Sequence, residues 1–239
     1  MKKTVIVTGA RRGLGLAIVK KLVDEGYKVL AVARAESSEL INICDDENVF
    51  FEKFDLANVD DIGTWVNKLT KRQGRIYALV NNAAIGGDGI LATMHEDDIS
   101  YTIKVNLHSP IILTKYVCRS MLIAGKGRII NISSIIATTG FSGLAVYAAT
   151  KSGLIGFTKS LSRELGKVGI NVNCIAPGYM ETDMTKSLDQ VKLSTIKRRS
   201  PSGKLATVES VANSVSFLLG ETGSLISGTT LTVDAGSTA

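Results

Sequence analysis

The segment Thr4-Val5-Ile6-Val7-Thr8-Gly9-Ala10-Arg11-Arg12-Gly13-Leu14-Gly15 joins a β-branched run to a glycine-rich turn, and apolar residues then recur at helical spacing up to Gly26. This order predicts a strand, a turn and a helix. Glycines let the backbone approach a pyrophosphate closely, and the start of a helix offers free N–H groups and the positive end of its dipole. The spacing Gly-x-x-x-Gly-x-Gly differs from the usual dinucleotide fingerprint, so its position directly after the first strand is the stronger indication.

Predicted strands and helices alternate over the rest of the chain. Six further runs predict strands at 28–33, 49–54, 76–80, 128–132, 170–176 and 229–233. Helical spacing is found at 59–71, 96–124, 147–165 and 208–219. This alternation predicts an α/β fold, a doubly wound Rossmann-type parallel sheet of about seven strands with helices on both faces. Without a Ser/Gly-rich linker, residues 1–239 are expected to form a single domain.

Two of the predicted helices contain residues that disfavour helix. Asn106 lies inside the segment 96–124, and Pro110 follows four residues later, so a local kink or a held water is expected there. The alternative for Asn106 is a side chain that simply faces solvent. Gly153 and Gly156 interrupt the segment 147–165. Interior glycines cost about 1 kcal/mol each relative to alanine, which suggests the close approach of another backbone, from this subunit or another.

Composition and charge exclude several classes of protein. The net charge is +6 and aromatic residues make up 5%, but the basic residues are spread along the chain, which argues against nucleic-acid binding. After Lys2 and Lys3 only a short apolar run follows, so we expect neither a signal peptide nor a membrane span. The expected location is therefore the cytoplasm. The three cysteines lack metal-ligand spacing and are expected to be reduced, with no metal site: Cys44, Cys118 and Cys174.

The residue after the second strand bears on the choice of cofactor. An acidic residue there would bind the ribose 2′-hydroxyl of NAD, but this chain has Arg34. Arg11 and Arg12 also line the glycine turn. Because guanidinium groups match phosphate oxygens, these residues predict NADPH rather than NADH. The alternative is that the arginines are simply solvated.

Tyr147 and Lys151 lie one helical turn apart, and Ser134 precedes the tyrosine by thirteen residues. The phenol and the ammonium would then face one bound molecule. A nearby cation favours the phenolate, so Lys151 is expected to lower the pKa of Tyr147 from its ordinary value near 10. The alternative is an ordinary exposed pair on an alanine-rich helix.

The remaining candidate residues follow the ends of predicted strands, where parallel sheets bind ligands. They are Asp55, Leu56, Asn82, Ala83, Ala84, Ser133, Ser134, Pro177 and Gly178. We therefore expect them to converge on one crevice with the glycine turn and the helix of Tyr147.

A polar segment at about 179–204 is predicted to form a lid. Met180, Met184 and Leu188 recur every four residues, which suits a helix that covers an acyl chain or a similar apolar substrate. The alternative is a surface helix packed on the core. Basic residues in this region either steer an anionic partner or form an ordinary solvated surface: Lys192, Lys197, Arg198, Arg199 and Lys204.

Taken together, these motifs resemble the short-chain dehydrogenase/reductase family over essentially the full chain, in the family's order and at its spacing. The matching motifs are Thr8-Gly9-x-x-x-Gly13-x-Gly15, Asn81-Asn82-Ala83, Asn106, Ser134, Tyr147-x-x-x-Lys151 and Pro177-Gly178. Within the family, the segment 147–165 and the run Ile175-Ala-Pro-Gly-Tyr-Met-Glu-Thr-Asp-Met184-Thr look most like the β-ketoacyl-carrier-protein reductases of fatty-acid synthesis.

The resemblance implies catalytic roles for four residues. Tyr147 would give a proton to the substrate ketone oxygen, and Ser134 would hydrogen-bond the same oxygen. Lys151 would hold the nicotinamide ribose and lower the pKa of the tyrosine, and Asn106 would anchor a water that resupplies the proton.

It also implies the cofactor contacts. Arg12 and Arg34 would take the 2′-phosphate, Asp55 and Leu56 the adenine, 82–84 the adenosine ribose, and Met180 and Thr182 the carboxamide. The full set expected to contact NADPH is Gly9, Arg11, Arg12, Gly13, Leu14, Gly15, Arg34, Asp55, Leu56, Asn82, Ala83, Ala84, Tyr147, Lys151, Pro177, Gly178, Met180 and Thr182.

The implied activity is NADPH-dependent reduction of a β-ketoacyl thioester, carried on an acyl carrier protein or on coenzyme A, by a homotetramer. Two alternatives stay open. One is a reductase of free ketones, sugars or polyols within the same family. The other is a catalytically silent NADP sensor or scaffold, which the complete set of four catalytic residues argues against.

Overall fold

The centre of the molecule is a seven-stranded parallel sheet, as the long β-branched and apolar runs predict for strands buried on both faces. The computed structural model describes residues 2–45, 47–180, 197–198 and 200–239. The strand order is β3-β2-β1-β4-β5-β6-β7. The strands are β1 (Thr4–Thr8), β2 (Lys28–Ala33), β3 (Val49–Lys53), β4 (Ile76–Asn81), β5 (Gly127–Ile132), β6 (Ile170–Pro177) and β7 (Thr230–Val233).

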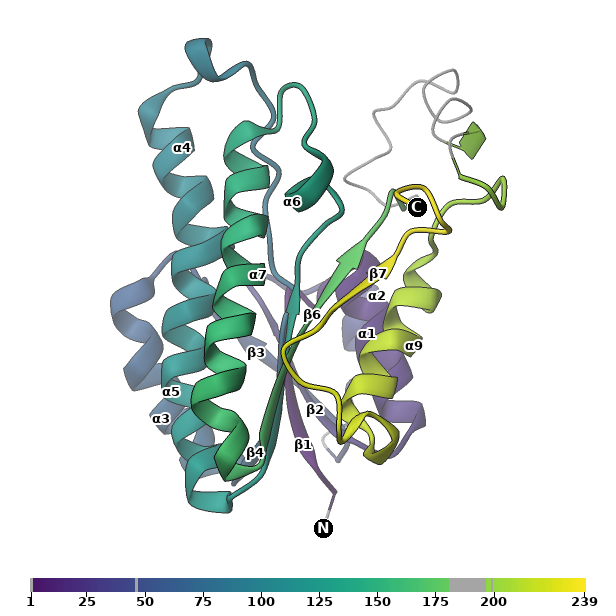
Figure 1. Cartoon of the computed structure of the whole chain (residues 1–239). Coiled ribbons are helices and arrows are strands. Elements are labelled where there is room, and N and C mark those ends of the chain that lie inside the picture. The colour runs from purple at the N-terminus through teal and green to yellow at the C-terminus, as the bar shows by residue number, and fades with distance from the viewer. Residues whose placement is uncertain (1, 46, 181–196, 199) are drawn as a thin grey trace.

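Helices cover both faces of this sheet (Figure 1). One face carries α1 (Gly13–Asp24), the short α2 (Ser38–Ile41) and α9 (Val208–Leu219). The other carries α3 (Ile62–Gln73), α5 (Ser109–Ala124) and α7 (Ala145–Leu165). Above the carboxyl ends of the strands lie α4 (Glu96–Ile103) and α6 (Ile136–Thr139). Each face has its own apolar core, and Trp65 packs against the second one, stacked on Phe54 at 4.3 Å.

Short helical turns complete the described structure. They are η1 (Val59–Asp61), η2 (Leu91–Thr93), the π turn η3 (Lys104–His108), η4 (Gly166–Val168) and η5 (Glu221–Gly223). Among the described residues, no helix combines the length and the hydrophobicity needed to cross a bilayer.

The strand order determines where a ligand can bind. The chain runs outward from β1 to β3, and then returns to place β4 on the other side of β1. The connections on the two sides of this switch point leave toward opposite faces, which opens a crevice at the carboxyl ends of β1 and β4. The glycine turn and the segment after β4 meet at this point.

The predicted fold class and the seven strands are confirmed, with strand ends that differ by one residue in several places. The predicted single helix over 96–124 is wrong in detail, because it consists of α4, a π turn and α5. Asn106 lies in that π turn and Pro110 in the first turn of α5, so the expected disturbance is confirmed. The short helices α2 and α6 were not predicted.

The explanation predicted for the glycines of α7 is wrong within this chain. A Cβ on Gly153 would lie 2.9 Å from Leu107 Cδ2, which is a side chain rather than a backbone. A Cβ on Gly156 would have nothing within 4 Å.

Candidate active site

The crevice begins where the ends of β1 and β4 are tied together. Thr8 Oγ1 accepts hydrogen bonds from the backbone N–H groups of Asn82 and Ala83, both at 3.0 Å. In return, Asn82 Nδ2 donates to the Thr8 carbonyl oxygen at 2.9 Å. The predicted cofactor residues after β4 are therefore fixed directly beside the glycine turn.

Each glycine of the turn has a separate structural reason. A Cβ on Gly15 would lie 2.1 Å from the Gly9 carbonyl oxygen, and one on Gly9 would lie 2.9 Å from Ala83 Cα. Both positions therefore exclude any side chain. Gly13 has open space around it but adopts a φ of +53°, in the left-handed region that glycine tolerates best.

The start of α1 has the character of an anion site. Its N-cap residue Arg12 has an extended backbone and makes no side-chain capping bond, and no acidic residue lies in the first turn. Arg11 and Arg12 are exposed, and Leu14 is buried beneath the turn. Free N–H groups, a positive helix end and two guanidinium groups fit the phosphates of a dinucleotide. A turn that excludes side chains at Gly9 and Gly15 fits the same group.

The ends of β2 and β3 carry the residues predicted for the adenosine half. Arg34 is exposed after β2, and its Nη1 donates to Tyr101 Oη at 3.3 Å. Asp55 Oδ1 accepts from the backbone N–H of Ala57 at 2.9 Å, so this carboxylate stabilises its own turn. Leu56 is buried. Its carbonyl oxygen accepts from Ser109 Oγ at 2.6 Å, which links this loop to the start of α5.

Asn106 binds the segment after β4 with both ends of its amide. Its Oδ1 accepts from the Ile85 N–H at 2.8 Å, and its Nδ2 donates to the Ile85 carbonyl oxygen at 2.9 Å. The side chain is fully buried, and its Nδ2 also lies 3.5 Å from Thr150 Oγ1 on α7. Asn106 thus clamps the loop to the helices, and the water-anchoring role stays a prediction.

Tyr147 and Ser134 come together as predicted. Ser134 follows β5 and Tyr147 lies in the first turn of α7, and the Ser134 hydroxyl is close enough to the phenol to affect its pKa. Burial raises the pKa of the Tyr147 phenol above its ordinary value of 10.0, and the nearby negative charge of Asp88 acts in the same direction. The nearby Ser134 hydroxyl partly offsets this rise in the pKa of Tyr147.

Lys151 is buried beneath the tyrosine. Its Nζ donates to the Ile132 carbonyl oxygen at 2.8 Å and lies 5.6 Å from the centre of the Tyr147 ring. Its backbone is held as well, because Ser133 Oγ donates to the Lys151 carbonyl oxygen at 2.8 Å. With 2% of its surface exposed, desolvation lowers the pKa of Lys151 to about 8.

The expectation that Lys151 lowers the pKa of Tyr147 is wrong for this structure. The ammonium points to the end of β5 rather than to the phenol oxygen, while burial acts on the phenol directly. The pair therefore exists at neutral pH as a protonated phenol above a buried ammonium.

The end of β6 forms the far wall of the crevice. The Pro177 carbonyl oxygen accepts from the Ile135 N–H at 3.0 Å, and the Gly178 N–H donates to the Val233 carbonyl oxygen at 2.9 Å. A Cβ on Gly178 would lie 2.6 Å from Asp234 Cβ, so this position also excludes a side chain. Met180 is partly buried in a β-bridge with Ala206.

Most of the predicted lid lies outside the described residues. This applies to Thr182, Met184, Leu188, Lys192 and Arg199. Three members of the basic group are described, and all are exposed: Lys197, Arg198 and Lys204.

Three contributors to the site were not among the candidate cofactor or catalytic residues: Thr8, Ile85 and Tyr101. Thr8 lies at a strand end beside the predicted Gly9, and this position is a signal that could have indicated it. Ile85 takes part through its backbone, which no sequence pattern reveals. Tyr101 lies far along the chain from Arg34, and only the tertiary fold brings the two together.

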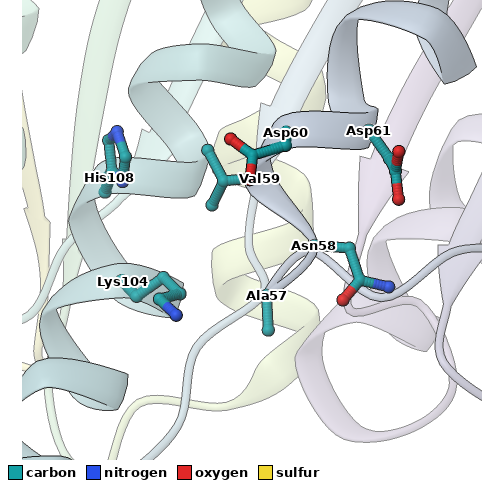
Figure 2. Close-up of a pocket in the computed structure, with 7 residues that line it drawn as sticks. All are labelled: Ala57, Asn58, Val59, Asp60, Asp61, Lys104 and His108. Atoms are coloured by element: carbon teal, nitrogen blue, oxygen red, sulfur yellow. The ribbon is translucent and has the colours of Figure 1, made fainter.

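Two pockets flank this region. One, of about 420 Å³, lies between the segment 85–89 and α4 and includes Asp88, His95 and Tyr101. The other, of about 400 Å³, lies between residues 57–61 and the π turn (Figure 2). There the Asp60 carboxylate points toward the wall of the pocket that carries His108. Lys104 belongs to the same π turn as His108. Within the described ranges, no three His, Cys, Asp or Glu residues are grouped to hold a metal ion.

The comparison with protein families agrees with this geometry. The model described as short chain dehydrogenase matches residues 3–192. The chain therefore belongs to the short-chain dehydrogenase family, whose members are oxidoreductases that use a nicotinamide dinucleotide.

Curated relatives narrow the comparison further. The chain is 39% identical over 239 residues to the 3-oxoacyl-[acyl-carrier-protein] reductase FabG of Salmonella typhimurium. It is 39% identical over 235 residues to the enzyme of the same name from Vibrio cholerae, and 38% over 239 residues to that of Escherichia coli. Each comparison covers 98% of this chain and 96% of the relative.

Proposed function

We propose that this chain is an NADPH-dependent reductase that converts a β-ketoacyl thioester, carried on an acyl carrier protein or coenzyme A, to the β-hydroxyacyl thioester. One observation carries the chemical step: the Tyr147 phenol lies beside the Ser134 hydroxyl, and the buried ammonium of Lys151 is 5.6 Å from the centre of its ring. The substrate class is supported by the names of three relatives that match almost the whole chain.

Tyr147 acts as the general acid in this proposal. Because its pKa is raised, the phenol keeps its proton at neutral pH and can donate it to the ketone oxygen. Ser134 Oγ lies beside the phenol and donates a hydrogen bond to the same oxygen as negative charge develops there. A bound reduced nicotinamide supplies the hydride.

Lys151 supports the reaction from below. A pKa of about 8 leaves the amine mostly protonated at pH 7. An ammonium has three N–H donors, and the bond to Ile132 uses one of them, so others can bind the hydroxyl groups of a nicotinamide ribose.

The preference for NADPH rests on Arg11, Arg12 and Arg34. All three are exposed and follow the carboxyl ends of β1 and β2, on the side of the crevice where the 2′-phosphate of the adenosine ribose would lie. A segment at about 179–204 would cover the acyl chain, and a cytoplasmic homotetramer is the assembly proposed with this activity.

The test is NADPH oxidation with acetoacetyl-coenzyme A and an acetoacetyl carrier protein, alongside NADH, small ketones and polyols. We expect turnover of the thioesters with NADPH and its loss in Tyr147→Phe. The matched control is Tyr116→Phe, since Tyr116 packs against Gly63 on α3. Turnover of small ketones or polyols without turnover of either thioester would overturn the substrate assignment. Full activity of Tyr147→Phe would overturn the mechanism.

A further inference from the structure

Tyr101 is an aromatic side chain that forms a hydrogen bond with Arg34, one of the predicted cofactor arginines. Its phenol oxygen accepts a hydrogen bond from Arg34 Nη1 at 3.3 Å. Arg34 immediately follows β2, whereas Tyr101 lies on α4, which packs against α7. The bond therefore joins the β2 end of the sheet to the helical layer on the α7 side (Figure 1).

Both partners are held on well-anchored segments. The chain after Arg34 is tied to the glycine turn, because Ser37 Oγ donates to the Arg11 carbonyl oxygen at 2.7 Å. On the other side, α4 is packed against the segment that follows β4. A Cβ on Gly87 would lie 2.8 Å from Thr102 Oγ1 of α4.

From this geometry we infer that Tyr101 is a positioning residue for the cofactor 2′-phosphate, acting through Arg34. The inference rests on the proposed use of NADPH. A free arginine side chain samples many rotamers, and each must be given up when it binds a phosphate. A phenol oxygen at 3.3 Å restricts the guanidinium before binding, beside the crevice where the 2′-phosphate is expected. Tyr101 is 37% exposed, so solvent weakens this effect but does not remove it.

The bond also suits the polarity of the site. The guanidinium has five N–H donors and no acceptor, so the bond to Tyr101 leaves others for phosphate oxygens. The phenol oxygen accepts one hydrogen bond from Arg34 and leaves the remaining N–H donors of the guanidinium for the phosphate. A carboxylate in the place of Tyr101 would repel a bound phosphate, whereas the phenol orients the arginine through a hydrogen bond.

The experiment measures binding of adenosine nucleotides by calorimetry, without catalysis. The probes are 2′,5′-ADP, which carries the 2′-phosphate, and 5′-AMP, which lacks it. The variants are Tyr101→Phe, Arg34→Ala, the double variant, and Tyr116→Phe as the matched loss of a phenol hydroxyl elsewhere. We expect Tyr101→Phe to weaken 2′,5′-ADP about fivefold, the effect of losing the preordering of one long side chain. Binding of 5′-AMP should change less than about twofold.

The double variant separates positioning from a general packing role. If Tyr101 acts through Arg34, Tyr101→Phe has no further effect once Arg34 is alanine. Equal 2′,5′-ADP affinity in Tyr101→Phe and the unmodified protein would overturn the inference, as would equal weakening of both nucleotides. If the unmodified protein binds 2′,5′-ADP no better than 5′-AMP, the proposed NADPH preference itself fails. This outcome concerns the unmodified protein alone and is therefore distinguishable from the two outcomes that concern Tyr101→Phe.

Discussion

The buried ammonium of Lys151 predicts that replacing it with an apolar residue stabilises the protein near neutral pH. Burial lowers its pKa from the ordinary value of 10.5 to about 8. The difference is about 2.5 pH units, and each unit is worth about 1.4 kcal/mol, so the charged form is penalised by about 3.5 kcal/mol in the folded state. The unfolded chain binds this proton more tightly. The penalty is therefore fully present below pH 8 and is lost as the pH rises from about 8 to about 10.5.

Lys151→Met keeps a side chain of similar length without the charge. It also removes the hydrogen bond from Nζ to the Ile132 carbonyl oxygen, a loss of about 1 kcal/mol. The net expectation at pH 7 is a gain of about 2.5 kcal/mol, which for a chain of this size raises Tm by about 5–10 °C. Turnover should be lost in the same variant, because the ammonium beside Tyr147 is gone.

Thermal unfolding between pH 6 and pH 10 tests this reasoning. The gain of Lys151→Met over the unmodified protein should be largest at pH 6–8 and small at pH 10. Lys159→Met is the matched control, since Lys159 is exposed on the same helix, and its Tm should follow the unmodified protein at every pH. A variant that is less stable at pH 7, or a difference that stays constant to pH 10, would refute the argument.

Three further outcomes follow from the same geometry. Tyr147→Phe should lower kcat by about 10²–10⁴ in nucleotide oxidation while nucleotide binding by calorimetry persists, and equal loss of both would contradict a general-acid role. Asn106→Ala removes two buried hydrogen bonds to the backbone of Ile85 and should lower Tm by about 4–10 °C, whereas Asn67→Ala at an exposed position should leave Tm unchanged. If the melting curves of Asn106→Ala and the unmodified protein coincide, these two hydrogen bonds do not stabilise the fold. Gly15→Ala places a Cβ 2.1 Å from the Gly9 carbonyl oxygen and should weaken NADPH binding more than tenfold, while the control Gly156→Ala, whose Cβ would have nothing within 4 Å, should bind NADPH as the unmodified protein does. Unchanged NADPH binding by Gly15→Ala would contradict the need for glycine at this position.

The sheet could be predicted because its signals are local. Runs such as Val5-Ile6-Val7 are buried on both faces and therefore lack polar alternation, and each is followed by a turn that marks where it ends. The disturbance near Asn106 and Pro110 was also local, since both residues disfavour a regular helix at their own positions. The sequence could not specify a π turn, because the extra residue is accommodated by the Asn106 amide on Ile85 and by Ser109 Oγ on the Lys104 carbonyl oxygen.

Candidates for the catalytic residues could be proposed from the sequence, but their charge states could not. Spacing places Lys151 one turn from Tyr147, and a cation so close should lower the pKa of a phenol. In the structure the ammonium is directed to Ile132, so desolvation controls both groups. Desolvation depends on what the whole fold packs around a residue, and the distance along one helix contains no information about that.

These charge states favour one direction of the reaction. Reduction needs a proton on the general acid, and a raised pKa keeps the Tyr147 phenol protonated at neutral pH. Oxidation of an alcohol needs the phenolate as base, which becomes available only at alkaline pH, where Lys151 with its pKa of about 8 has lost its charge. The ammonium and the phenolate are therefore scarcely present together at any pH in the resting site. At neutral pH the resting site therefore holds the proton that reduction requires, whereas alcohol oxidation should become faster only as the pH rises and the phenol loses its proton.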